Sequence, residues 1–444
     1  MAQTRRLGKQ NERRSYRMRR GFRPCYVADN LLNASATAGY WLYGLTIYRQ
    51  ANPWIGNMIQ LARILGFIGI VARVVALLPA LGASYLQLPV KGYLEGEPIS
   101  TTVDSGLAKY YLENSPSRTA ANSELDRRIT DIEQRFEKRP LDWLTLREIS
   151  AETTPDFATL FFIKQSLSDS RNARLQKAYW QEVRRINAAT HRTSRAVSAR
   201  SELRKYKLIF VPGFHYLSDQ SSGADFHNQR QLFRQLGLSI ELAATQEDGT
   251  IQENAAIIAG VVRSESRSSA PLILISASKG GPETALALGK MLEPSETRSV
   301  KAWLSVGGLI EGTFLADHVT GWPKSWLARI ALRYSGIDPR SLPGMTTTAS
   351  RERMKEITLP LHIFVLQFVG APLSGDIAND VRDRYIELRK YGPNDGLTLL
   401  ADELVPRGIT VIEPGLDHFY RDPEIDLKSL ALANIVADEL ADKE

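Results

Sequence analysis

The chain has 444 residues, of which 43% are apolar and 24% are charged, and its net charge is +7. This apolar content is sufficient for a full hydrophobic core, which excludes collagen-like, low-complexity and wholly disordered chains, and the length favours two to three domains. The single cysteine, Cys25, excludes an intramolecular disulfide and a Cys-rich zinc site.

The positive charge is concentrated at the start of the chain. Nine of the first 23 residues are Arg or Lys and only Glu12 is acidic, so the rest of the chain is nearly neutral. We therefore expect residues 1–29 to form a basic, disordered tail that could bind anionic lipid or nucleic acid by charge alone. No nucleic-acid partner is expected for the folded body.

Residues 30–90 are unusually apolar. Residues 30–48 contain no charged side chain, and residues 64–90 contain only Arg73. Both stretches are long enough to cross a bilayer, although Arg73 and Pro79 are unfavourable within one. Three interpretations stay open: a membrane hairpin, helices lying on the membrane surface, and helices packed on the soluble body. We expect residues 30–90 and the basic tail to make the chain membrane-associated, on an undefined side, and the protein to be cytoplasmic otherwise.

Residues 91–204 are rich in charged side chains, and their apolar spacing predicts a mainly helical region. Long helices are predicted over residues 123–138 and 171–204, and residues 156–166 are more apolar. No combination of side chains typical of catalysis occurs in this region.

Residues 205–444 alternate short apolar stretches with amphipathic ones. Strands that are apolar throughout and are separated by helices indicate a parallel sheet covered on both faces. The predicted strands are 207–211, 239–242, 271–275, 302–306, 361–368 and 410–412. The predicted helices are 229–236, 253–263, 282–292, 377–390 and 427–442. A helical cap insertion is expected at about 310–356, with an apolar face formed by Trp322, Trp326, Leu327, Ile330 and Leu332.

The segment 272–281 carries the most informative motif. Its sequence LILISASKGG reads as a strand, a tight turn and a helix, with Ser278 at the turn. Such a turn holds a serine in a strained conformation that exposes its hydroxyl, and it needs small residues two positions before and after it. Ser276 and Gly280 meet that need, so Ser278 is the predicted nucleophile.

A serine nucleophile of this kind needs a base and an acid later in the chain. Among the six histidines, His418 follows the strand 410–412 and precedes the last helix, which is where a base on a C-terminal loop should lie. Asp395, in an Asn-Asp-Gly turn, is the predicted acid, and Asp376 and Asp380 compete with it. The acid would hold the imidazole tautomer and stabilise the imidazolium ion.

The first predicted strand ends in the sequence Pro212-Gly213-Phe214. Gly213 allows a sharp turn, so the amide of Phe214 and the amide of Lys279 are the predicted oxyanion donors. The next two residues, His215 and Tyr216, are expected to contact the substrate.

A metal site could be drawn from His215, Asp219, Asp225 and His227, but their spacing is not that of a ligand set. No glycine-rich loop has phosphate-binding spacing either. We therefore expect no metal and no cofactor.

Taken together, residues 205–440 resemble the α/β-hydrolase superfamily, in particular its lipase-like and esterase-like members. The resemblance rests on the runs SKGG at 278–281, NDGL at 394–397, DHF at 417–419 and GTFLAD at 312–317. It implies an α/β-hydrolase fold with a helical cap, preceded by the mainly helical region. It also implies a Ser278, Asp395 and His418 triad and an acyl-enzyme mechanism. Ser276 and Pro212 depart from the usual glycine and histidine of the family, and no family is recognised for residues 1–204.

The predicted function is that of a serine hydrolase acting on a carboxylic ester or thioester, with a small acyl ester or a lipid as substrate. Two alternatives stay open. One is a membrane-tethered scaffold with a hydrolase-like body and no turnover, and the other is acyl transfer to an alcohol or amine by the same triad.

Overall fold

The computed structural model describes residues 86–114, 123–193, 199–268, 270–321 and 338–442. All of them belong to the second of two compact units, Tyr85–Glu444. The basic tail, most of the apolar stretch 30–90 and the apolar cap face predicted within 322–337 lie outside the described residues. Among the helices that are described, none combines the length and apolar character needed to cross a membrane.

A six-stranded parallel sheet in the order β4–β3–β5–β6–β7–β8 forms the centre of this unit. All six strands were predicted, and each bound lies within three residues of the predicted one. His362, predicted to lie in a strand, lies in a turn before β7. The strands are β3 (Lys207–Val211), β4 (Ser239–Leu242), β5 (Leu272–Ala277), β6 (Val300–Val306), β7 (Phe364–Ala371) and β8 (Ile409–Pro414).

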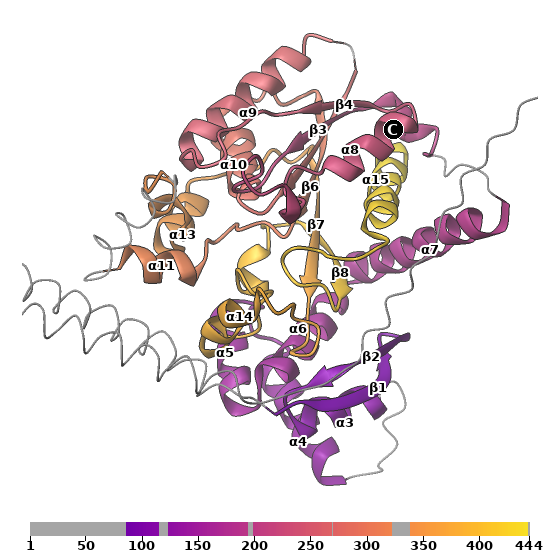
Figure 1. The fold of residues 1–444 in the computed structure, drawn as a ribbon, viewed down its shortest axis with the longest axis vertical. Helices are drawn as coiled ribbons and strands as arrows, with labels where there is room; N and C mark the ends of the chain where they lie inside the picture. Colours follow the sequence, from indigo (N-terminus) through magenta and orange to yellow (C-terminus); the bar gives the residue numbers. More distant parts are fainter. Residues whose placement is uncertain (1–85, 115–122, 194–198, 269, 322–337, 443–444) are drawn as a thin grey trace, which may run out of the picture. The chain divides into compact units, whose positions relative to one another are not determined.

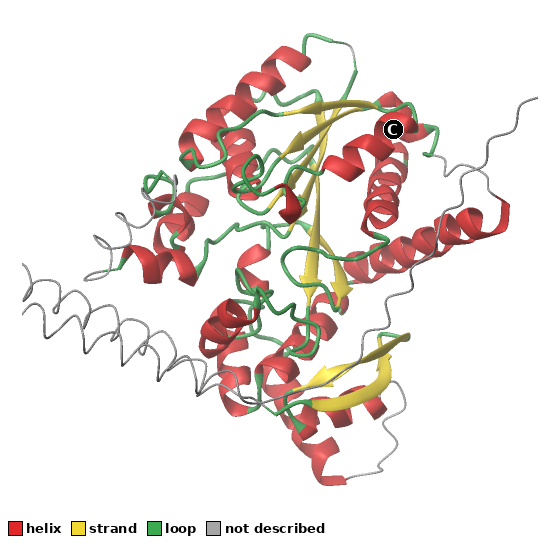
Figure 2. Cartoon of the chain, in the orientation of Figure 1, coloured by secondary structure: helices red, strands yellow, loops and turns green. Residues whose placement is uncertain are grey.

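Helices cover both faces of the sheet, as Figure 1 and Figure 2 show. Successive residues of a strand point to opposite faces. In β3, Phe210 belongs to the core under α7, α8 and α15, whereas Ile209 belongs to the core under α9 and α10. The helices of this part are α8 (His227–Gln235), α9 (Ile251–Glu265), α10 (Gly280–Leu286) with a π-helical turn η4 (Ala287–Met291), and α15 (Ile425–Ala441).

The region before the sheet is helical, as predicted, but it also contains an antiparallel hairpin of β1 (Leu88–Leu94) and β2 (Glu97–Val103). Its two-residue turn, Glu95–Gly96, has positive φ at both positions, which is typical of tight hairpins. Residues 88–90, predicted as part of the apolar helical segment, therefore lie in a strand. The helices are α3 (Gly106–Asn114), α4 (Ser123–Phe136), α5 (Trp143–Glu152), α6 (Pro155–Leu167) and α7 (Ser170–Thr193).

Helix α7 ends at Thr193 rather than at the predicted residue 204, and a short 3₁₀ turn, η2 (Glu202–Lys205), leads into β3. The first half of α7 covers the outer edge of β8. The Gln176 side chain donates to the Ile412 carbonyl at 2.9 Å and accepts from the Ile412 amide at 2.7 Å, and Asn172 accepts from the Thr410 amide at 2.9 Å. These bonds pair backbone groups of the edge strand β8 that would otherwise have no hydrogen-bond partner in the sheet.

The hairpin and helices α3, α5 and α6 enclose a third hydrophobic core. Buried residues near the carboxyl ends of β7 and β8, including Val369, Ala371 and Ile412, belong to it. The region before the sheet therefore packs against the end of the sheet where the predicted acid and base lie.

The rest of the described chain consists of short elements between the strands. The described part of the predicted cap insertion contains α11 (Phe314–Thr320), η5 (Pro343–Met345) and α13 (Thr347–Lys355). The predicted helix 377–390 is reduced to α14 (Arg382–Leu388). Three further 3₁₀ turns are η3 (Gln220–Ser222), η6 (Arg389–Tyr391) and η7 (Leu400–Glu403). The sheet, its covering helices and the strand–turn–helix at β5 and α10 make this an α/β-hydrolase fold, as predicted.

Candidate active site

The strand order reverses at β3, because β4 lies on one side of it and β5 on the other. Helix α8 follows β3 and packs on one face of the sheet, whereas helix α9 follows β4 and packs on the opposite face. In open parallel sheets, ligands bind in the crevice that this reversal leaves at the carboxyl ends of the strands. Ser278 follows β5 and Gly213 follows β3, so both lie at this crevice.

Ser278 occupies a strained turn. Its φ of +51° is in the left-handed region, which non-glycine residues rarely adopt, and its amide donates to the Val306 carbonyl at 3.0 Å. Gly280 is required two residues later: a Cβ there would lie 2.7 Å from the Pro212 carbonyl oxygen and 2.9 Å from that of Val211. The turn therefore sits directly on the end of β3.

Ser276, which replaces the glycine usual at its position, is fully buried in β5. Its hydroxyl accepts a hydrogen bond from the indole Nε1 of Trp303 at 2.9 Å. Trp303 belongs to the core under α9 and α10. The serine is thus accommodated by a buried polar partner.

The structure brings Ser278, His418 and Asp395 into one hydrogen-bonded chain. His418 Nε2 lies 2.9 Å from Ser278 Oγ, and His418 Nδ1 lies 2.5 Å from Asp395 Oδ2. The His418 and Asp395 side chains are 5% and 1% exposed, so solvent competes little for these bonds. Neutral His418 in this arrangement carries its proton on Nδ1 and offers Nε2 as an acceptor to the serine hydroxyl.

The turn around Asp395 fixes its carboxylate. Oδ1 accepts the amides of Leu397 and Thr398, both at 2.8 Å, while Oδ2 faces His418. The His418 amide in turn donates to the Asp395 carbonyl at 2.9 Å. Backbone and side-chain bonds therefore join the acid loop to the base loop.

The competing acids have other partners. Asp376 accepts from the Thr101 hydroxyl at 2.5 Å and from the Leu373 amide at 2.9 Å. Asp380 is exposed and forms two bonds of 2.6 and 2.7 Å with Arg421. Among the candidate acids, Asp395 alone contacts His418 in the described structure.

The predicted oxyanion donors lie beside Ser278. A Cβ on Gly213 would be 3.3 Å from the Cβ of Ser278, so the loop that carries Phe214 touches the turn that carries Lys279. Among the hydrogen bonds of the described residues, neither the Phe214 amide nor the Lys279 amide has an acceptor. Both N–H groups are therefore available to an anionic oxygen at Ser278.

The Lys279 side chain runs into the interior rather than into the crevice. It is 1% exposed, donates to the Gly249 carbonyl at 2.6 Å, and lies 3.1 Å from a carboxylate oxygen of Glu283. Burial raises the pKa of Glu283 to about 7, while the nearby Lys279 charge opposes this rise. The ammonium group also lies 5.5 Å from the ring centroid of Phe214. The Lys279 side chain therefore links its own turn to the loop that carries Phe214.

A cavity of about 670 Å³ opens at Ser278 and His418. Its inner wall is apolar and includes Phe210, Ile275, Leu304, Phe368 and Leu432, and its mouth carries polar side chains of residues 219–229. Such a cavity lies within the size range of small-molecule sites.

Of the two residues expected to contact substrate, only His215 lines this cavity. Tyr216 is buried, and its hydroxyl donates to the Thr245 carbonyl at 2.8 Å, so it supports the loop instead of facing the crevice. Burial raises the pKa of Tyr216.

Several residues with a strained backbone line the cavity. His215, Phe226, Ser278 and Tyr420 are non-glycine residues with positive φ, between 49° and 57°, and all four line it. Strain of this kind persists where the surrounding structure over-determines it, and it clusters at functional sites. Tyr420, two residues after His418, is held in this conformation by the end of β7. Its hydroxyl donates to the Phe368 carbonyl at 2.9 Å and accepts from the Gly370 amide at 2.8 Å.

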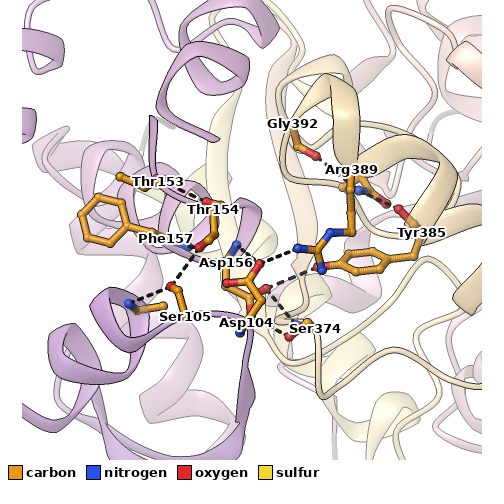
Figure 3. Close-up of polar contacts among 12 residues, drawn as sticks. Asp104, Ser105, Thr153, Thr154, Asp156, Phe157, Ser374, Tyr385, Arg389 and Gly392 are labelled. Atoms are coloured by element: carbon orange, nitrogen blue, oxygen red, sulfur yellow. Dashed lines mark hydrogen bonds and ion pairs between the residues drawn. The ribbon is translucent and has the colours of Figure 1, made fainter. Parts of the chain in front are cut away.

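A buried polar cluster ties the region before the sheet to the acid loop (Figure 3). Asp156, at the start of α6, accepts from the Ser374 hydroxyl at 2.6 Å, from the Ser374 amide at 2.9 Å and from the Tyr385 hydroxyl at 3.3 Å. Asp104 accepts from Arg389 at 2.9 Å. Tyr385 lies in α14 and Arg389 in η6, the two elements before the turn that carries Asp395. The Asn394 side chain of that turn donates to the Tyr385 carbonyl at 3.4 Å, so this cluster supports the turn.

Asp156 lies next to a second carboxylate. Its Oδ2 accepts the Asp104 amide at 2.7 Å, and the Asp156 amide donates to Asp104 Oδ2 at 3.3 Å. Burial first, and the Asp104 charge second, raise the pKa of Asp156 to about 7. Sequence reasoning missed this cluster because Asp104 and Asp156 lie more than 200 residues before Ser374 and Arg389, and no local motif marks them.

The residues of the hypothetical metal site have other partners: His215 pairs with Ser218, Asp219 with Ser221 and Asp225 with Arg230. Within the described ranges, no three His, Cys, Asp or Glu side chains converge to hold a metal ion.

No protein-family model and no curated protein matches the sequence. Solved structures with a similar fold include the metagenomic carboxyl esterase MGS0156, which is 22% identical with a TM-score of 0.44 and covers 56% of this chain and 78% of its own. The mature Bacillus licheniformis lipase BlEst2 is 20% identical with a TM-score of 0.43, covering 53% and 92%. The Staphylococcus hyicus lipase is 13% identical with a TM-score of 0.44, covering 56% and 100%. The likeness is one of fold and extends over about half of the chain.

Proposed function

We propose that this protein is a serine hydrolase that cleaves a carboxylic ester or thioester through an acyl-enzyme on Ser278. The observation that carries the proposal is the hydrogen-bonded chain from Ser278 through His418 to Asp395, at a strained turn that opens into a cavity. A nucleophile, a base and an acid that orients the base form the arrangement that activates a serine hydroxyl.

The reaction follows from these positions. Ser278 Oγ attacks the acyl carbon while its proton passes to His418 Nε2, and the oxygen that becomes negative is bound by the Phe214 and Lys279 amides. The imidazolium ion, stabilised by Asp395, then gives the proton to the leaving alcohol or thiol. Water attacks the acyl-enzyme by the same route, which releases the acid and restores Ser278.

The cavity favours an apolar acyl group. Its inner wall consists of aliphatic and aromatic side chains, which would lose contact with water when an acyl chain binds. The polar mouth, formed by residues 219–229, suits the ester group and the more polar part of the substrate. We therefore propose acyl esters or lipids as the substrate class.

Active-site labelling with a fluorophosphonate probe tests this proposal. The wild-type protein should be labelled, Ser278→Ala should not, and Ser276→Ala should be labelled like the wild type because its hydroxyl is buried against Trp303. Hydrolysis of 4-nitrophenyl esters of increasing chain length then measures acyl preference. Equal labelling of Ser278→Ala and the wild type, or no labelling of a folded wild-type protein, would refute the proposal.

We also propose that residues 30–90 and the basic tail bring the protein to a membrane. Their apolar and basic composition supports this proposal. Carbonate extraction of the full chain tests attachment, with a chain that starts at residue 86 as the control, and protease accessibility tests the side. Equal release of both chains into the soluble fraction would contradict it.

A further inference from the structure

Glu403 is the most anomalous buried group near the triad. It lies at the end of η7, only 1% exposed, and both of its carboxyl oxygens are enclosed without a hydrogen-bond donor in the described structure. Buried polar atoms are nearly always paired, so an unpaired carboxyl group inside a protein needs a physical explanation.

The neighbour of this group is the acid of the triad. After the turn at Asp395 the chain returns on itself, with Asn394 bridged to Leu399 and the Leu400 amide bonded to the Pro393 carbonyl at 3.1 Å. This return brings the Glu403 carboxyl group close to the Asp395 carboxyl group, which raises the pKa of Glu403 through its charge and through a side-chain contact. Two ionised carboxylates can only accept, so the contact is a hydrogen bond only if one of the two carries a proton.

The partners of each group decide where that proton resides. Asp395 accepts three donors, namely the Leu397 and Thr398 amides and the His418 ring, all of which stabilise its charged form. Glu403 has none of these donors. Burial and the charge of Asp395 both raise the pKa of Glu403 well above its ordinary value.

The other charged and titratable groups around Glu403 do not change this assignment. Asp402 precedes it and is paired with Arg351 through two contacts of 3.0 and 3.2 Å. Tyr420 lies near both acids, and its hydroxyl is engaged by the backbone at Phe368 and Gly370. No cation among these neighbours is available to hold Glu403 in an ionised state.

We propose that Glu403 is a positioning residue whose protonated carboxyl group donates to Asp395, holds that carboxylate toward His418 and moderates the basicity of His418. This inference rests on the proposed triad and extends it to a fourth side chain. With neutral Glu403, the site carries one negative charge next to the imidazole instead of two, and Asp395 has a fourth donor that limits its rotation.

The sign of a pKa change separates this role from the alternatives. The substitution Glu403→Leu removes the neutral donor to Asp395 and leaves that carboxylate more electron-rich. The pKa of His418 should therefore rise by about half a unit to one unit relative to the wild type. If Glu403 were ionised, the same substitution would remove a negative charge and the pKa of His418 would fall. Glu403→Gln keeps a donor of similar shape and should leave the pKa nearly unchanged.

The experiment measures the pKa of His418 by NMR titration of the full chain labelled in histidine, with His418→Gln to assign its signal. Because this titration does not depend on turnover, it remains decisive if Ser278 labelling fails and the proposed hydrolase activity is wrong. If the protein is active, the acid limb of kcat/KM should shift upward with the pKa in Glu403→Leu, and kcat should fall about tenfold with KM nearly constant. Asp376→Asn, at a buried carboxyl group that does not touch the triad, should leave the titration unchanged.

Infrared spectroscopy provides a second measurement that does not require Glu403→Leu to fold. The difference between wild type and Glu403→Gln at neutral pH should contain the carbonyl stretch of a protonated carboxyl group. Absence of that band, a downward shift of the His418 pKa in Glu403→Leu, or no shift at all would overturn the proposal.

Discussion

The Asp156 cluster should make stability depend on pH in a direction opposite to that of an ordinary salt-bridged aspartate. The pKa of Asp156 rises from 3.8 to about 7 in the folded protein because the group is buried beside Asp104. A folded-state pKa above the unfolded one means that the stabilising contribution is fully present below about pH 3.8 and is lost as pH rises through about 7. From these two values, the free energy of unfolding should fall by about 3 kcal/mol between about pH 5 and about pH 8 through this group alone.

The variant Asp156→Asn isolates that contribution because an amide does not ionise. It also costs stability at low pH, since an amide nitrogen in place of Oδ2 cannot accept from the Asp104 amide or the Ser374 hydroxyl. A buried donor left without an acceptor costs about 1–3 kcal/mol. The variant should therefore be clearly less stable than the wild type near pH 5, and the difference should close or reverse near pH 8.

Denaturant unfolding of both proteins across this pH range measures the effect, with equal m-values as the check that the same transition is compared. Titrating groups that do not interact with Asp156 cancel in the difference between the two curves, and its neighbour Asp104 contributes with it. Stability curves that run parallel from about pH 5 to about pH 8 would show that Asp156 does not change protonation there, and the account of the cluster would be wrong.

Three further substitutions test the geometry of the site. Asp395→Asn should lower kcat by about 10⁴ with little change in KM, because an amide disturbs the His418 tautomer, whereas Asp380→Asn, at the exposed competing acid, should leave both unchanged. Gly280→Ala should lower kcat by at least about 10²-fold and lower Tm, because its Cβ would lie 2.7 Å from the Pro212 carbonyl oxygen. The control Gly260→Ala, where a Cβ meets no neighbour in α9, should leave activity intact and raise Tm because alanine favours a helix. Trp303→Phe should lower the free energy of unfolding by about 1–3 kcal/mol because it leaves the buried Ser276 hydroxyl without its donor. The double variant with Ser276→Ala should lose less than the sum of the two single variants, which a double-mutant cycle measures.

Local sequence signals were sufficient to predict the strands of the sheet and to select Ser278, His418 and Asp395, which the structure joins by hydrogen bonds. The turn at Ser278 was recognisable because a strained serine between small residues has a strict local pattern, and His418 and Asp395 followed from chain order. The hairpin of β1 and β2 was missed, although the Glu95–Gly96 turn was a usable signal. Tyr216 was misplaced because proximity in sequence to Phe214 does not determine which way a side chain points.

The contacts that support the triad were beyond local signals because they join distant parts of the chain. Ser374 and Asp156 are 218 residues apart, and their pairing depends on how α6 packs against the loop after β7. Glu403 is only eight residues from Asp395, but its charged sequence context is equally typical of a solvated turn. Burial raises the pKa of both Asp156 and Glu403, and burial is a property of the tertiary structure.

The same packing predicts that the C-terminal half does not fold alone. A chain that starts at residue 205 would lose helices α3 to α7, which bury Val369, Ala371 and Ile412 at the end of the sheet. It would also lose the Gln176 side chain, whose two bonds pair the free edge of β8, and leave Ser374 without Asp156.

We therefore expect residues 205–444 to be insoluble or to unfold without a cooperative transition, whereas residues 86–444 should unfold cooperatively and retain probe labelling at Ser278. Calorimetry and labelling of the two chains give the comparison. Because the lost contacts lie against the loops that carry Asp395 and His418, a folded and fully active 205–444 chain would mean that the N-terminal helices do not support the triad. That result would also remove the physical link drawn between the Asp156 cluster and the acid loop.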